Sequence, residues 1–118
     1  MTGTDDLVRD LATAAPGLEA LRREHVADYH ALLPQVFLGD VTRWLRTTAP
    51  APAAASVLAV LERHWTSGDE AVRNAIAASF LENLEPEDAA LRAALGPGLR
   101  AELRASESWT PGHPDQPT

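Results

Sequence analysis

Hydrophobic residues recur along most of this chain at the three- to four-residue spacing of an amphipathic α-helix. The first such segment follows Thr4, whose hydroxyl we expect to cap the helix, and it ends near Pro16 and Gly17. The second segment runs from Leu18 to Leu33 and stops before a proline. Its expected buried arc consists of Leu18, Leu21, Val26, Tyr29, Leu32 and Leu33.

A third helix is predicted from Val36 to Arg46 and a fourth from Ala54 to Thr66. Between them, Thr47–Ala55 is rich in proline and alanine and has no hydrophobic period, so we expect an extended surface loop. Helical rotation places Glu62 and Arg63 on the outer side of the fourth helix. The expected core stripes are Phe37, Leu38, Val41, Trp44 and Leu45 on the third helix and Val57, Leu58, Leu61 and Trp65 on the fourth.

The stretch Ser67–Leu84 is apolar on nearly every side, which predicts one continuous central helix covered by its neighbours. Asp69 is expected to cap this helix at its start. The expected inward residues are Val72, Ile76 and Phe80. On a covered helix, polar side chains need hydrogen-bonding partners, and those present are Asn74, Ser79, Glu82 and Asn83. We expect Asn83 to bond to the backbone of a loop or of a neighbouring helix.

The C-terminal part of the chain contains two further helical segments. Glu85–Asp88 is expected to start a helix that ends at Gly96–Gly98, and Leu99–Ala105 to form another. Residues 110–118 contain three prolines and no large apolar residue, which predicts a disordered tail; Trp109, just before it, either packs on the domain or faces a partner. Because no two-residue alternation occurs, residues 1–109 are predicted to form one compact all-α domain of about five to seven helices.

Two longer motifs resemble known families. The helix pair in residues 55–84, ASVLAVLERHWTSGDEAVRNAIAASFLENL, resembles a HEAT repeat, in which Asp69 caps the second helix, Val72 plugs the core and Arg73 reaches a neighbouring unit. One such pair is too short for a solenoid, so the resemblance implies a compact HEAT-like bundle. LLPQVFLGDVTRWL, followed by GDEAVRNAIAASFLENL, resembles a family of small bacterial all-helical proteins of unknown function. That resemblance implies a fold and a bacterial source, and it supplies no catalytic residues.

The charge of the chain limits the classes of partner. The 118 residues include 17 acidic and 10 basic side chains, the basic ones all arginine, and the net charge is −7. Nucleic-acid binding needs clustered cations, so we predict no nucleic-acid partner, whereas a basic protein suits this surface. The chain has no cysteine, no signal-peptide pattern and no apolar run of about 20 residues. These features predict a cytoplasmic protein that does not bind membranes.

The residues capable of chemistry are scattered along the sequence. The histidines lack the spacing of a metal site, and we expect His25 and His64 to be hydrogen-bonded packing residues; the other two are His30 and His113. Ser56, Ser67 and Ser79 lack the glycine-flanked setting of a nucleophile, and the glycines form no phosphate-binding loop. We therefore predict no catalytic, cofactor-binding or metal-binding residues, and a protein that is not an enzyme.

Two groups of charged residues are candidates for a partner-binding site. Gly39 costs about 1 kcal/mol inside a helix and is followed by Asp40 and Arg43 on the side away from the apolar stripe. One interpretation is a close approach of another helix over Gly39 with an Asp40–Arg43 ion pair, and the other is a docking surface. The second group serves either as helix caps and solvated charge or as a binding surface; it consists of Glu82, Glu85, Glu87 and Asp88.

A protein-binding function fits these patterns best. We predict a bacterial immunity-type protein whose acidic surface neutralises a basic toxin domain, by analogy with other small acidic proteins of this kind. A structural or regulatory helical scaffold is the alternative. A small-molecule-binding protein or an enzyme stays open, because residues far apart in sequence can assemble a site. No pattern in the sequence specifies the oligomeric state.

Overall fold

The computed structural model describes residues 3–31, 33–48 and 52–108, and every regular element within these ranges is a helix. The predicted compact all-α fold is confirmed. The predictions for Trp109 and for residues 110–118 lie outside the described residues. The elements are α1 (Thr4–Ala14), α2 (Pro16–Tyr29), α3 (Pro34–Thr48), α4 (Pro52–Ser67), α5 (Glu70–Ser79), the 3₁₀ helix η1 (Leu81–Asn83), α6 (Ala89–Ala93) and α7 (Pro97–Ser108).

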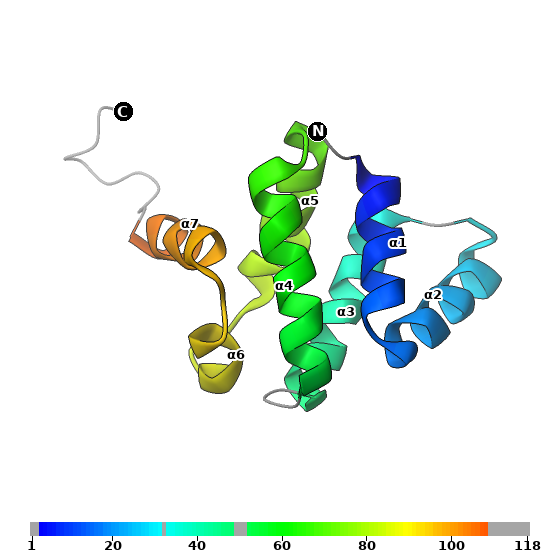
Figure 1. Cartoon of the computed structure of the whole chain (residues 1–118), viewed down its shortest axis with the longest axis horizontal. Helices are drawn as coiled ribbons and strands as arrows, with labels where there is room; N and C mark the ends of the chain where they lie inside the picture. The colour runs from blue at the N-terminus through cyan, green and yellow to red at the C-terminus, as the bar shows by residue number, and fades with distance from the viewer. Residues whose placement is uncertain (1–2, 32, 49–51, 109–118) are drawn as a thin grey trace.

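Helix α4 runs through the middle of the molecule and separates the first helices from the last ones (Figure 1). Helix α1 packs against both α4 and α2, and α2 lies on the outer side. Helix α3 packs mainly against α5, and α5 lies behind α4 in this view. Helices α6 and α7 lie on the opposite side of α4, where α7 contacts it. Helix α4 therefore joins two groups of helices.

The core contains the apolar residues that the helical periodicity predicts. Phe37 and Phe80 are its largest fully buried side chains. Trp44 and Trp65 are only partly buried and pack against the edge of the core. The other predicted core residues of α3, α4 and α5 that are buried are Leu38, Val41, Leu45, Val57, Leu58, Leu61, Val72 and Ile76. Since burying one large apolar side chain contributes about 1.5–3 kcal/mol, these stripes supply the main stabilisation of the fold.

Helix α2 differs from its prediction at both ends. It begins at Pro16, because proline suits the first position of a helix, and it ends at Tyr29. His30 follows in the left-handed conformation, with φ of 59°. The predicted buried arc is wrong in its second half: Val26, Tyr29 and Leu33 are 37%, 51% and 40% exposed. The apolar spacing is present, but none of the described helices covers the side of α2 that carries Val26 and Tyr29.

The extended loop predicted for Thr47–Ala55 is also wrong. Helix α3 continues to Thr48, and α4 begins at Pro52, so the connection left between them is three residues long. Pro52 occupies the first position of α4, where its missing N–H costs nothing, and the alanines after it have the highest helix propensity.

The continuous helix predicted over Ser67–Leu84 is wrong, because α5 stops at Ser79 and a 3₁₀ turn follows. In a continuing helix the Ser79 carbonyl would accept from the backbone N–H of Asn83. Here it accepts from the Asn83 side-chain amide at 2.8 Å and from the Thr42 hydroxyl at 3.1 Å, while the Asn83 N–H donates to the Phe80 carbonyl. Asn83 thus bonds within its own segment, and not to a loop or another helix as predicted.

Helix α5 is also not covered on all sides. Its Asn74 side chain is exposed, as is that of Glu82 in η1, so both can be hydrated where we expected protein partners. Ser79 is buried. The helix is therefore amphipathic, with Val72 and Ile76 on its inner side.

The turn between α4 and α5 matches its prediction. The Asp69 carboxylate accepts a hydrogen bond from Val72 N at 2.9 Å, which confirms the helix cap. Arg73 Nε donates to the Trp65 carbonyl at 3.1 Å, so Arg73 reaches back to α4 within its own helix pair, and not to a neighbouring unit as expected. A Cβ atom on Gly68 would lie 2.5 Å from the His64 carbonyl oxygen, which explains why glycine occupies this turn.

Helices α6 and α7 depend on two carboxylates. Residues 85–88 form a turn in which Asp88 accepts from Glu85 N at 2.8 Å, and α6 begins only at Ala89, later than predicted. Helix α7 begins at Pro97, and Glu62 of α4 accepts hydrogen bonds from Gly98 N at 2.7 Å and Leu99 N at 2.9 Å. The outward orientation predicted for Glu62 is therefore wrong, because this side chain caps α7; Arg63 is exposed, as predicted.

Candidate functional site

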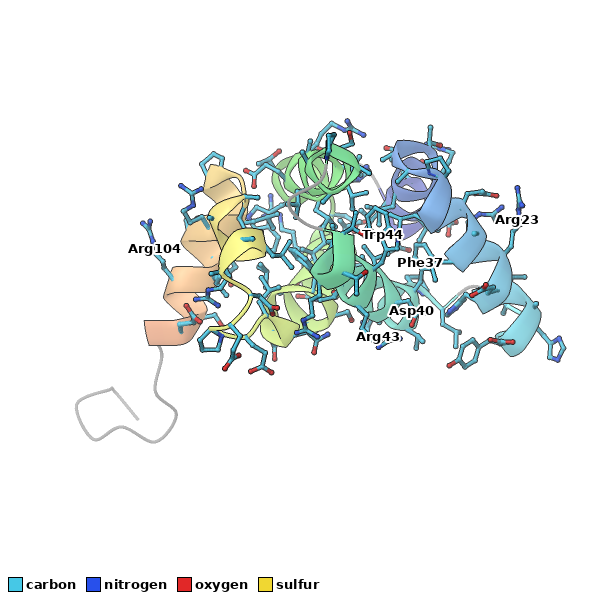
Figure 2. All side chains as sticks on the ribbon, turned by 90° about the horizontal axis from the view of Figure 1, so that it is seen from below. Arg23, Phe37, Asp40, Arg43, Trp44 and Arg104 are labelled. Atoms are coloured by element: carbon cyan, nitrogen blue, oxygen red, sulfur yellow. The ribbon has the colours of Figure 1, made fainter. Side chains whose placement is uncertain are left out.

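The predicted partner-binding residues come from two parts of the chain, the outer surface of α3 and the segment from η1 to α6, and Arg46 of α3 joins the two. We call this surface the acidic face; its residues are Asp40, Arg43, Arg46, Glu82, Glu85, Glu87 and Asp88. Figure 2 shows Asp40 and Arg43 at the outer edge of α3, with Phe37 and Trp44 nearer the interior. The acidic face contains five carboxylates and two guanidinium groups, so it carries net negative charge.

Arg46 holds the two parts of the acidic face together. Its Nε donates to both Asp88 carboxylate oxygens, at 3.3 and 3.1 Å, and its Nη2 donates to the Asn83 carbonyl. The Asp88 side chain is only 14% exposed. Asp88 is thus occupied with a structural role. Sequence reasoning missed Arg46, because no local pattern links residues that are 42 positions apart.

Asp40 forms the predicted ion pair with Arg43 on the next turn of α3. Its Oδ2 atom also lies 3.8 Å from Nδ1 of the buried His25. The helix approach expected over Gly39 is wrong, because no atom lies within 4 Å of where its Cβ would be. A close approach occurs instead at Gly17, where a Cβ would lie 2.7 Å from Nε1 of Trp44.

Glu82, Glu85 and Glu87 are the accessible part of the acidic face. All three side chains are exposed, and none forms an ion pair with another residue in the described ranges. Glu85 and Glu87 lie between Asn83 and Asp88, the two residues that Arg46 bonds, and Glu82 directly precedes Asn83 in η1. This arrangement presents three carboxylates to solvent on a backbone that is held in place.

The two buried histidines are packing residues with hydrogen bonds, as predicted. His64 Nε2 lies 2.8 Å from Asp10 Oδ2, and Arg63 donates to the same oxygen at 3.1 Å. The hydrogen bond from His64 lowers the pKa of Asp10, with help from Arg63 and against the opposing effect of partial burial. His25 Nε2 accepts from Leu33 N at 2.8 Å, and the ring packs near Tyr29, with centroids 4.8 Å apart. His30 is exposed, and His113 lies outside the described residues.

The described part of the surface includes several hollows. One between α1 and α2 measures about 300 Å³ and contains Arg9, Glu19 and Arg22; another, of about 410 Å³, lies beside Glu62. A larger one, about 550 Å³, is mainly apolar and lies between the start of α3 and the outer side of α5. Across the described ranges, no cluster of three or more histidine, cysteine or acidic residues has a geometry that could hold a metal ion.

None of the helices within the described residues has both the length and the apolar character needed to cross a membrane. No curated protein and no solved structure matches the chain significantly. A family model does match, and it covers residues 8–110, nearly all of the described helices. The chain therefore belongs to the family described as Domain of unknown function (DUF7674).

Proposed function

We propose that this chain is a non-enzymatic protein-binding protein, and that it acts in the bacterial cytoplasm as an immunity-type protein that neutralises a toxin domain. The observation that carries the proposal is the set of exposed carboxylates of Glu82, Glu85 and Glu87, which have no ion-pair partner among the described residues. They suit a basic surface on the toxin domain.

The way this segment is held supports a binding role. The hydrogen bonds from Arg46 to Asp88 and to the Asn83 carbonyl fix the connection before any partner arrives. A fixed surface loses less conformational entropy on binding than a flexible one. Exposed carboxylates mainly accelerate the encounter with a basic partner and select against acidic ones. Occluding the toxin's own basic substrate-binding surface would neutralise it.

The experiment co-expresses the chain with the products of the genes adjacent to its own, followed by size-exclusion chromatography and a growth assay. We expect a stable complex with a toxic neighbour and rescue of growth. The double variant Glu82→Arg/Glu87→Arg should weaken the complex by about tenfold or more, mainly through slower association. These positions are better suited to charge reversal than Asp40, whose carboxylate is paired with Arg43 and lies 3.8 Å from Nδ1 of the buried His25.

The matched control is Glu24→Arg/Glu102→Arg, which changes the net charge equally but on α2 and α7. It should bind and protect nearly as well as the wild type. Equal weakening by both double variants would mean that overall charge, and not the acidic face, determines binding. A neighbouring gene product that forms no complex, together with no rescue of growth, contradicts the immunity proposal.

A further inference from the structure

A single buried side chain attaches the second half of α2 to the rest of the molecule. The buried residues of α2 are Leu18, near its start, and His25. Across the described residues from Arg23 to Val36, His25 is the one buried side chain. Figure 1 shows this half of α2 and the connection to α3 at the edge of the molecule. The attachment of the segment therefore depends on the contacts of the His25 ring.

The hydrogen bond of the His25 ring fixes its protonation state. Nε2 lies 2.8 Å from the backbone nitrogen of Leu33, which is a donor, so Nε2 accepts this bond and carries no proton. A neutral imidazole then carries its one proton on Nδ1. The His25 side chain is fully buried, so water does not replace the bond while the segment stays in place. The closed arrangement thus requires the neutral ring with its proton on Nδ1.

The groups that face the ring compensate a positive charge only weakly. Nδ1 has no hydrogen-bond partner among the described residues, and the Asp40 Oδ2 atom of α3 lies 3.8 Å away. The other oxygen of Asp40 is paired with Arg43, which weakens its attraction for an imidazolium. Two aromatic rings lie close to the imidazole, Tyr29 with centroids 4.8 Å apart and Phe37 at 6.0 Å. A charge buried in such surroundings is unfavourable.

The other charged groups of the neighbouring helices form no ion pair with His25. Helix α1 also packs against α2, but its Arg9 is bonded to Asp6, and its Asp10 to Arg63 and His64. The charged or titratable residues of α2 and of the connection after it pair with one another or are exposed; they are Glu19, Arg22, Arg23, Glu24, Asp28 and His30. The contacts with Leu33 and Asp40 therefore dominate the response of His25 to protonation.

We propose that His25 acts as an acid-sensitive latch, in which protonation of its imidazole releases the second half of α2 and the connection to α3. A proton added at Nε2 would face the N–H of Leu33, so two donors would meet and the closing hydrogen bond would be lost. In the released state the ring is in water and binds the proton freely. The released state thus binds one more proton than the closed state, and acidification favours release. Histidine changes charge between about pH 5 and pH 8, so the latch responds in this range.

Release also alters the apolar hollow beside α5. Leu33 contributes to the lining of that hollow, and its carbonyl accepts from Phe37 N at 2.9 Å in the first turn of α3. Loss of the bond from Leu33 to His25 therefore loosens one wall of the hollow. The latch does not depend on binding of a toxin domain, because it concerns the attachment of one segment to its own fold.

The test is an NMR titration of the full-length, ¹⁵N-labelled chain from about pH 7.5 to about pH 5. Ring ¹⁵N shifts report the tautomer of His25, and amide hydrogen exchange, corrected for its intrinsic pH dependence, reports the opening of each segment. We expect the proton on Nδ1 at neutral pH. The opening of Leu33 and of the second half of α2 should increase by about tenfold or more in acid, because only the released ring gains a proton. Exchange in α4 should change much less.

Two variants of His25 separate its charge from its hydrogen bond. His25→Gln offers an acceptor oxygen that binds no proton in this range, so the opening of the segment should no longer depend on pH. His25→Leu has no acceptor and should open the segment to a similar extent at both ends of the pH range. The matched control is His30→Asn, which removes an exposed histidine of the same connection and tolerates its left-handed backbone. The control should respond to acid like the wild type.

Four results would overturn the latch. The first is a proton on Nε2 of His25 at neutral pH, and the second is an opening of Leu33 that stays constant over the titration. The third is an acid response that spreads evenly over all helices, which would assign it to global stability. The fourth is an acid response that persists in His25→Gln or His25→Leu, which would assign it to another group. The first three are read on the wild type, so they decide even if neither variant folds.

Discussion

Helices α5 and α7 begin in different ways. The first N–H groups of a helix have no acceptor within that helix. A carboxylate accepts a hydrogen bond from one of these groups in α5 and from two of them in α7. In α5 the carboxylate is local, because Asp69 directly precedes the helix and accepts from Val72 N. In α7 the carboxylate is borrowed, because Glu62 of α4 accepts from Gly98 N and Leu99 N. The residue before Pro97 is a glycine, which has no side chain for this purpose.

The difference determines what each helix needs in order to form. Asp69 can cap α5 as soon as its first turn folds. Glu62 can cap α7 only when α4 has formed and α7 has docked on it, so the start of α7 is coupled to tertiary structure. Close packing adds to this dependence, since a Cβ on Gly98 would lie 2.7 Å from Glu62 Oε2 and 2.9 Å from Trp65 Cδ1.

Removing the borrowed cap is expected to have the largest effect. Glu62→Ala leaves the N–H groups of Gly98 and Leu99 without their charged acceptor and should lower the free energy of unfolding by about 2–3 kcal/mol. Denaturant unfolding measures this loss, and amide hydrogen exchange should show it concentrated in α7. Glu62→Gln retains one acceptor oxygen and should lose less. A loss spread evenly over all helices would contradict the local role of Glu62.

Removing the local cap is expected to cost less. Asp69→Ala should lower the free energy of unfolding by about 1 kcal/mol, the usual value for a lost N-cap. Hydrogen exchange should accelerate in the first turn of α5, whereas α7 should stay protected. Asp69→Ser, which retains a capping oxygen, is the control and should recover most of the stability. If Asp69→Ala were as destabilising as Glu62→Ala, the proposed distinction between the two caps would fail.

A third carboxylate gives the smallest effect and tests the role of charge. Asp6 accepts from Gly3 N at 3.2 Å at the start of α1, and this backbone hydrogen bond is the main reason that its pKa is lowered. The stabilisation is therefore complete above the unfolded pKa of about 3.9 and is lost as the pH falls through the lower folded value. Thermal unfolding of the wild type and of Asp6→Asn should differ by a constant amount from neutral pH to about pH 5, and converge below about pH 4. A difference that persists in acid would assign the effect to shape and not to charge.

Features that depend on neighbours in sequence were predictable. The Asp69 cap, the burial of Val72, Ile76 and Phe80, and the Asp40–Arg43 pair all follow from spacings within one or two helical turns. The end of α5 was not predictable, because the Ser79 carbonyl is satisfied in part by Thr42, 37 residues away. The same holds for Glu62, whose partners are 36 and 37 residues distant.

The candidate sites show the same difference between features that depend on sequence neighbours and features that depend on distant residues. The sequence left open whether Glu82, Glu85 and Glu87 are helix caps and solvated charge or a binding surface, and all three are exposed. It gave no sign that Asp88 is used by Arg46, because that contact depends on how α3 packs beside η1. The apolar spacing of Val26, Tyr29 and Leu33 predicted a buried stripe, since periodicity reports that a face is apolar and not whether anything covers it.

The positions of two tryptophans give the protein built-in spectroscopic reporters. The indole of Trp44 lies directly beneath Gly17 at the start of α2, and that of Trp65 lies against Gly98 at the start of α7. Each ring therefore senses the departure of a different peripheral helix from the core. In a chain whose Trp109 is replaced by phenylalanine, single-tryptophan versions would let fluorescence follow the detachment of α2 and of α7 separately, in real time and without an added dye.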